Sequence, residues 1–554
     1  MFDKFGGVTR RNFVKGGVAA SALAGLAACS SSSTGSSSST SSSTSDTGTY
    51  TGGTVSFYIN DPVAIDPYNC QESEGTQVVK CLFDPLTRYD WAGQELLPAA
   101  AESWEANDDA SEFTFHLVKD AKFHNGDAVT SECFKRGWER MCDPTMATPS
   151  EVSYHLDPVV GAKDMVAGTA KEISGVTCPD DNTLVVKLTA PMADWPIVCS
   201  HQALDPVPQA ATDDPASFLL APIGNGPFKM DGKWVSGQYI NVAKFDGYYG
   251  TAANIDAVNF SIQKDPDTAF LEFTAGNIDF TSIPSGRFAE IKSQYGESSD
   301  GYTVTPNAQV LDGAEASTYY LCLNCKDATM SNVNVRRAIS LAINRQNICD
   351  TLFEGVRKPA TNIFPPIIDD DSSNDWQDCY YDKDAAQKLV DDNNLAGTKI
   401  TLSCNSGGGH EDIMACVQGD LQAVGFVVDI QTQEWAAYLT ALGDGNFQVG
   451  RLGWIADYPT MDNFLYPNFF STADNNYSKW VSTDFDSKIE AARQIVDDDE
   501  RRTAYREINQ IVGDDMPVIP LMWYAHNHVG SEKFKSMYYD AAGIAHLATC
   551  ELNV

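Results

Sequence analysis

His410 and Glu411 begin a pattern that could bind a catalytic metal, because His-Glu-x-x-His on one helix places two zinc ligands on the same face. Met414 stands where the second histidine would be, so we expect no zinc site there. The sequence also contains no Gly-x-Ser-x-Gly turn and no phosphate loop ending in Gly-Lys-Ser/Thr. Without a catalytic constellation, we expect that the protein is not an enzyme.

Two shorter patterns contain possible metal ligands. Cys322 and Cys325 fall in a predicted strand that would point their thiols to opposite faces, so buried small residues are expected there. His526 and His528 would share one face of a strand and could bind a metal weakly, but the sequence offers no third ligand. We therefore expect neither a metal nor a cofactor.

Residues 1–28 are typical of an export signal. Residues 9–15 (TRRNFVK) match a twin-arginine motif, and the apolar run at 16–28 is too short to span a bilayer. That run ends in Leu-Ala-Ala before Cys29, which resembles a bacterial lipobox. We expect Cys29 to carry a lipid and to begin the mature chain. The alternative is an alanine-rich helix with a buried cysteine.

The remainder of the chain has the composition of a tethered, folded protein. Residues 30–49 are almost all Ser, Thr and Gly, so residues 29–49 should form a lipidated cysteine and a flexible tether. The following ~500 residues exceed the size of one hydrophobic core, which predicts at least two lobes. A net charge of −37 disfavours nucleic acid as a partner. Thirteen cysteines besides Cys29 leave at least one unpaired, and their spacing assigns no disulfide.

Strands and helices alternate along the chain, as in mixed α/β lobes. Residues 53–59 and 113–117 alternate apolar and polar positions, which predicts two strands. Thr130 is a candidate N-cap for a helix that follows. The apolar face of that helix consists of Phe134, Trp138 and Met141.

A second stretch repeats this order near the middle of the chain. Residues 319–323 predict a strand, and a helix with apolar positions from Val335 to Ile343 follows, capped by Asn332 or Asn334. Near the end, a helix containing Tyr505, Ile508, Ile511 and Val512 should close at Gly513. Residues 517–524 then predict an extended segment.

Several segments in one order resemble the oligopeptide/dipeptide-binding proteins of ABC importers, solute-binding protein family 5. The segments are 97–105 (LPAAAESWE), 113–117 (FTFHL), 122–127 (KFHNGD), 226–228 (GPF), 335–339 (VRRAI), 453–459 (GWIADYP), 475–476 (NN), 485–486 (FD) and 517–520 (PVIP). The resemblance implies an α/β fold, a bilobed clamp of the periplasmic-binding-protein type (class C) with mixed sheets and one lobe of two subdomains. It places lobe 1 at 50–83, 209–316 and 527–554, its subdomain at 84–208, and lobe 2 at 317–526.

The resemblance also implies how a ligand would be held. Two lobes close over an extended ligand, whose backbone pairs with protein strands. Asp457 would accept hydrogen bonds from the α-ammonium of a peptide, and Trp435 and Trp454 would wall side-chain pockets. Arg451 and His410 would contact the carboxylate end. The other expected ligand-binding residues are Tyr458, Tyr319, Gln71 and Glu72.

Some positions depart from the family pattern. An acidic residue expected early in the chain falls at Gln71, with Glu72 adjacent, and Phe353 replaces a lysine, with Arg357 and Lys358 nearby. The resemblance thus implies a monomeric peptide-capturing lipoprotein outside the cytoplasmic membrane, with ABC permease subunits and cytoplasmic ATPases as partners. The alternatives are a nickel complex, haem or oligosaccharide as ligand, and a peptide-sensing receptor.

Overall fold

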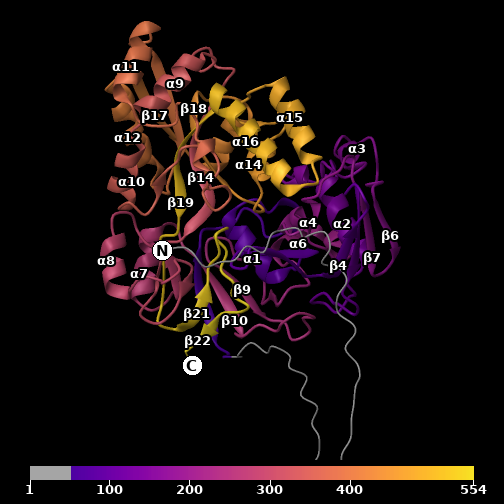
Figure 1. Cartoon of the computed structure of the whole chain (residues 1–554). Coiled ribbons are helices and arrows are strands. Elements are labelled where there is room, and N and C mark those ends of the chain that lie inside the picture. Colours follow the sequence, from indigo (N-terminus) through magenta and orange to yellow (C-terminus); the bar gives the residue numbers. More distant parts are fainter. Residues whose placement is uncertain (1–50, 554) are drawn as a thin grey trace, which may run out of the picture.

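The structure of the protein is a computed structural model that describes residues 51–553. The export signal, the lipidated Cys29 and the tether predicted for residues 1–49 lie outside the described residues. Within them the chain folds as a bilobed α/β clamp with mixed sheets, as expected (Figure 1).

The first large sheet is the base of lobe 1, the body at the bottom of Figure 1. Its strand order is β13 (Val310–Leu311), β20 (His528–Gly530), β11 (Phe280–Ser282), β1 (Thr54–Ile59), β10 (Ala257–Ile262), β9 (Tyr239–Lys244) and β8 (Phe228–Met230). The predicted first strand is β1, which pairs parallel with β10 and buries every second residue. Lobe 1 also contains β12 (Thr303–Val304), β21 (Phe534–Tyr538), β22 (Glu551–Leu552), α1 (Ser73–Leu82), α5 (Ala210–Asp213), α6 (Pro215–Leu220), α7 (Pro266–Thr274) and α8 (Phe288–Tyr295).

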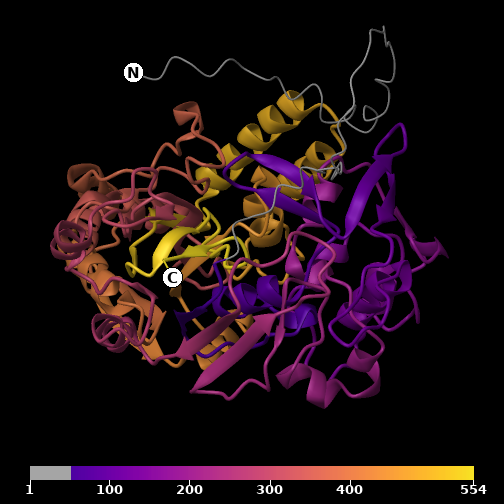
Figure 2. The same ribbon diagram turned by 90° about the horizontal axis from the view of Figure 1, so that it is seen from below.

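The residues between α1 and α5 form a second body, the β2–β7 region, drawn in purple at the right of Figures 1 and 2. Its strands are β2 (Thr87–Asp90) paired with β3 (Glu95–Pro98), and a sheet of β4 (Ala101–Ala106), β5 (Glu112–Leu117), β7 (Thr183–Lys187) and β6 (Val176–Asp180). Its helices are α2 (Ser131–Cys142), α3 (Ala162–Val166), α4 (Trp195–Val198) and the short 3-10 helices η3 (Ser153–Leu156) and η4 (Gln202–Leu204). The predicted apolar faces of β5 and α2 pack in one core.

Lobe 2 is built on a six-stranded sheet in the order β15 (Lys358–Pro359), β19 (Val518–Ala525), β14 (Ala314–Leu323), β18 (Val449–Ile455), β16 (Lys399–Asn405) and β17 (Val427–Gln433). Its helices are α9 (Val333–Ala342), α10 (Arg345–Phe353), α11 (Lys383–Asp392), α12 (His410–Gln422), α13 (Trp435–Gly443), α14 (Met461–Phe469), α15 (Thr483–Arg493) and α16 (Asp498–Asp515). Apolar cores lie on both faces of this sheet, because β14 alternates between two separate clusters.

The chain passes between the two large sheets twice, from β13 to β14 and from β19 to β20. These two crossings lie side by side, since His526 N donates to Gly313 O at 2.8 Å. Hinges consist of a few loop or element-terminal residues, and these two crossings are such residues.

Two local expectations were wrong. The helix expected to close at Gly513 continues to Asp515 and ends with Met516 in the left-handed region. Gly513 is needed for packing instead, because a Cβ there would lie 2.5 Å from the Trp376 ring. Cys325 is also not in a strand, since β14 ends at Leu323.

Candidate functional site

A cavity of about 1370 Å³ lies between the lobes and is lined by residues of lobe 1, the β2–β7 region and lobe 2. Eight of the nine expected ligand-binding residues line it: Gln71, Glu72, His410, Trp435, Arg451, Trp454, Asp457 and Tyr458. Tyr319 does not, because its side chain is fully buried on β14. The fold therefore brings together positions from almost the whole length of the described chain.

One side of the cavity is a free strand edge. β18 pairs with β14 along its whole length, but its pairing with β16 ends at Gly450. Among the described residues, no strand covers that second edge from Arg451 to Ile455, and these residues line the cavity. An uncovered edge of this kind can accept an extended ligand backbone as an added strand.

Asp457 lies two residues beyond β18, and its carboxylate is fixed by neutral donors. Tyr154 Oη donates to Asp457 Oδ2 at 2.8 Å, and Asn463 Nδ2 donates to the same oxygen at 2.8 Å. Asn463 also accepts from the Asp457 backbone N–H at 2.9 Å, which holds the turn after the strand. Burial, followed by the nearby Asp457 charge, raises the pKa of Tyr154, so its hydroxyl stays a donor.

Two histidines that sequence analysis missed also face Asp457. His201 Nε2 lies 3.6 Å from Oδ1, and His155 Nε2 lies 3.9 Å from Oδ2. Burial lowers the pKa of His155 to about 4 and that of His201 well below its usual range, so both rings are neutral at pH 7. Within residues 51–553, no lysine or arginine lies within 4.0 Å of Asp457. Its negative charge therefore has no fixed cation.

The other end of the free edge is positively charged. Arg451 Nε donates to Asn405 Oδ1 at 2.7 Å, and its guanidinium lies over the rings of Trp435 and Tyr319 at 5.5 and 5.8 Å. Tyr319 Oη lies 3.3 Å from His410 Nδ1. Burial, and then the charges of Arg451 and Arg357, lower the pKa of His410 to about 3.

The remaining expected residues have structural contacts as well. The Glu72 carboxylate is the N-cap of α1, where Oε2 accepts from Gly75 N at 2.8 Å and Oε1 accepts from Val63 N at 3.0 Å. Gln71 is exposed at the cavity wall. Trp454 is half-buried and donates from Nε1 to Asn463 Oδ1 at 3.1 Å, which links it to the support of Asp457.

The sequence was compared with known proteins. Residues 95–476 match the model of "Bacterial extracellular solute-binding proteins, family 5 Middle". The chain belongs to this family. It is therefore an extracytoplasmic solute-binding protein, from a family that consists of solute-binding proteins rather than enzymes.

Individual members of the family differ in their described ligands. The periplasmic oligopeptide-binding protein OppA of Haemophilus influenzae is 28% identical over 486 residues, which cover 84% of this chain and 87% of that protein. The probable deoxycholate-binding periplasmic protein YgiS of Escherichia coli is also 28% identical, over 84% of this chain and 86% of that protein. The solved structure of Haemophilus influenzae OppA in complex with RPPGFSPFR has a TM-score of 0.78 and 26% identity, with 91% of this chain and 99% of that chain covered.

None of the helices within residues 51–553 is long and apolar enough to cross a membrane. All thirteen cysteines in this part of the chain are free thiols.

Proposed function

We propose that the protein captures short peptides outside the cytoplasmic membrane and delivers them to an ABC permease with cytoplasmic ATPases. The observation that carries this proposal is the position of Asp457, an uncompensated carboxylate that lines the cavity at one end of an uncovered strand edge. A peptide α-ammonium supplies the cation that this carboxylate lacks.

The opposite end of the edge suits a peptide carboxylate. Arg451 and His410 line the cavity there, and Arg451 can bind a carboxylate through its planar guanidinium. Asp457 lies six positions after Arg451, so an extended strand spans at most about 20 Å between them. That length suits peptides of a few residues. Trp435 and Trp454 would then contact their side chains.

The lobes would close over the peptide by bending at the two crossings between the large sheets. In this proposal lobe 1 comprises residues 50–83, 209–316 and 527–554 with the subdomain 84–208, and lobe 2 comprises residues 317–526. The protein would act as a monomer, hold its ligand without catalysis, and be attached to the membrane by a lipid on Cys29 after twin-arginine export.

A second candidate ligand is a bile-acid-like amphiphile, because a relative of equal identity is named for deoxycholate. Such a ligand has a carboxylate for Arg451 but no amine for Asp457. The two candidates therefore differ in what they require of Asp457.

The test is calorimetric titration of the purified full chain, stripped of bound ligand, with free peptides of graded length, their N-acetylated copies and deoxycholate. Binding of free peptides alone would support amine capture through Asp457. Binding of deoxycholate alone would replace the peptide proposal with the second candidate. Equal binding of free and acetylated peptides would contradict the role of Asp457.

A further inference from the structure

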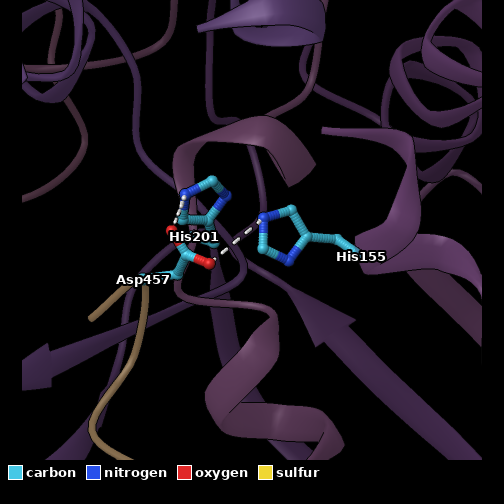
Figure 3. A group of neighbouring side chains, drawn as sticks. All are labelled: His155, His201 and Asp457. Carbon is cyan, nitrogen blue, oxygen red and sulfur yellow. Dashed lines mark ion pairs between the residues drawn. The ribbon is translucent and has the colours of Figure 1, made fainter. Parts of the chain in front are cut away.

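His155, His201 and Asp457 form a cluster of metal-ligand type at the wall of the cavity (Figure 3). One donor atom from each residue lies within 4.8 Å of the other two. The imidazole rings are 4.1 Å apart between centroids, and both turn a nitrogen toward the carboxylate. Sequence analysis expected no metal site, because these residues are far apart in the chain and follow no spaced motif.

The missing hydrogen bonds of His155 are the observation that points to a ligand. Its side chain is fully buried, yet neither Nδ1 nor Nε2 has a hydrogen-bond partner in the structure. A neutral imidazole normally uses both nitrogens when it is buried, since an unpaired buried polar group is costly. A bound cation would supply the missing partner for one of them.

The distances are close to those of a coordination sphere. Zinc held at about 2.0–2.1 Å by nitrogen and oxygen in a tetrahedron places its ligand atoms about 3.3 Å apart. His201 Nε2 is 3.6 Å from Asp457 Oδ1 and His155 Nε2 is 3.9 Å from Asp457 Oδ2, so the side chains must rotate to bring both nitrogens to this distance from one oxygen.

The surroundings of the cluster suit a metal ion with one coordination position left open. Tyr154 and Asn463 both donate to Asp457 Oδ2, which orients the carboxylate in the way that outer partners of metal ligands do. His201 and Asp457 line the cavity, so a fourth position would face solvent or a bound solute.

We propose that His155, His201 and Asp457 bind a divalent transition-metal ion of the zinc type. The ion lies between the two Nε2 atoms and the carboxylate, with its fourth coordination position open to the cavity. Two imidazoles and one carboxylate are a donor set that zinc accepts, whereas calcium and magnesium prefer oxygen ligands alone. Zinc and a peptide α-ammonium would use the same Asp457 carboxylate and compete for it, so zinc binding is proposed for the solute-free cavity and is tested apart from peptide capture.

Metal binding also requires the ring proton of His201 to move from one ring nitrogen to the other. Its Nδ1 accepts from the Ala203 N–H at 3.3 Å, which places the ring proton on Nε2 in the metal-free protein. The metal takes the place of that proton, which moves to Nδ1, and the Ala203 contact opens.

The test is zinc titration of the full chain, stripped of metal and solute, against a chromophoric chelator. The variants are His155→Phe, which replaces the buried ring with another ring, and Asp457→Asn, which changes a partly exposed side chain while keeping its shape. The matched control is His116→Ala, because His116 is a half-exposed histidine on β5 that faces Glu105 rather than the cavity. Cobalt is titrated in parallel, since its absorption distinguishes imidazole ligands from thiolates.

One equivalent of zinc should bind to the native chain and to His116→Ala, with affinity at least about tenfold lower in both site variants. Cobalt should show ligand-field bands without a thiolate charge-transfer band. The proposal is overturned if the native chain binds no stoichiometric zinc. It is also overturned if His155→Phe and Asp457→Asn bind like the control, or if cobalt reports thiolate ligands.

Discussion

Asp194 and Arg501 form a buried ion pair between the β2–β7 region and lobe 2, with Oδ1 and Nη2 2.9 Å apart although 307 residues separate them in the chain. The side chains are only 11% and 6% exposed. Because the two residues belong to bodies that both line the cavity, we expect the pair to break when the clamp opens.

Asp194→Asn should therefore favour the open clamp. Loss of one charged partner costs about 1.5–3 kcal/mol, which predicts ligand affinity lower by roughly ten- to a hundredfold. Small-angle scattering with and without ligand would measure the larger open fraction. Asp484→Asn is the control, since Asp484 pairs with Lys488 on the surface of α15 and such exposed pairs contribute little. Equal scattering and affinity in both variants would contradict a role in closure.

Asp457→Asn tests amine recognition directly. A buried ammonium left without its carboxylate costs about 3–5 kcal/mol, so free peptides should bind at least about a hundredfold more weakly. Calorimetry measures this loss. Glu434→Gln, at another acidic residue that lines the cavity, should leave affinity nearly unchanged. Similar losses in both variants would indicate a general effect of cavity charge.

Arg451→Ala tests recognition of the C-terminal carboxylate of the peptide. We expect the native protein to bind a peptide more tightly than its C-terminal amide, because Arg451 pairs with the free carboxylate. In Arg451→Ala that difference should fall by about 1–3 kcal/mol. The comparison of acid and amide within each protein removes any general effect of the substitution on packing. An unchanged difference would place the carboxylate elsewhere.

His124 should make stability depend on pH. Its Nδ1 accepts from Gly224 N at 3.1 Å and its Nε2 donates to Gly226 O at 3.2 Å, an arrangement that only the neutral ring can make. Burial is the main cause that lowers the pKa of His124 to about 4, from an ordinary value of 6.5. Between pH 6.5 and about 4, His124 is therefore protonated in the unfolded state but not in the folded state. The free energy of unfolding falls as the pH drops through this range.

His124→Phe should be less stable than the native protein at pH 7. It should lose less stability than the native protein as the pH falls from 6.5 to about 4. Chemical denaturation at several pH values measures the difference in slope between variant and native protein. His116→Ala, at a half-exposed histidine, should keep the native slope. A variant slope equal to that of the native protein would exclude His124 as a source of acid sensitivity.

Gly224→Ala should destabilise lobe 1. A Cβ at Gly224 would lie 1.9 Å from the carbonyl oxygen of Leu82, and backbone cannot move aside as a side chain can. We expect a loss of about 1–3 kcal/mol in the free energy of unfolding. Gly419→Ala is the matched control, because nothing lies within 4 Å of that Cβ on α12, and it should be neutral or stabilising by about 0.5–1 kcal/mol. Equal effects would show that the chain can relax around Gly224.

Sequence alone determined the features that depend on neighbouring residues. The alternation in residues 54–59 fixes which side of β1 is buried, and Asn332 accepts from the Asn334 N–H at the start of α9. The order of motifs identified the family, and the GWIADYP segment singled out Trp454 and Asp457, which the structure places at the end of β18 and just beyond it. These features follow from local geometry, which a linear pattern encodes.

Only the tertiary structure decided what surrounds Asp457. Tyr154 lies 303 residues away in the chain, and His155 and His201 follow no motif, yet all three meet the same carboxylate. The fold also showed that Glu72 caps a helix and that Tyr319 is buried behind the cavity wall. Such contacts depend on how separate bodies pack against one another, and no periodicity within a single segment records that arrangement.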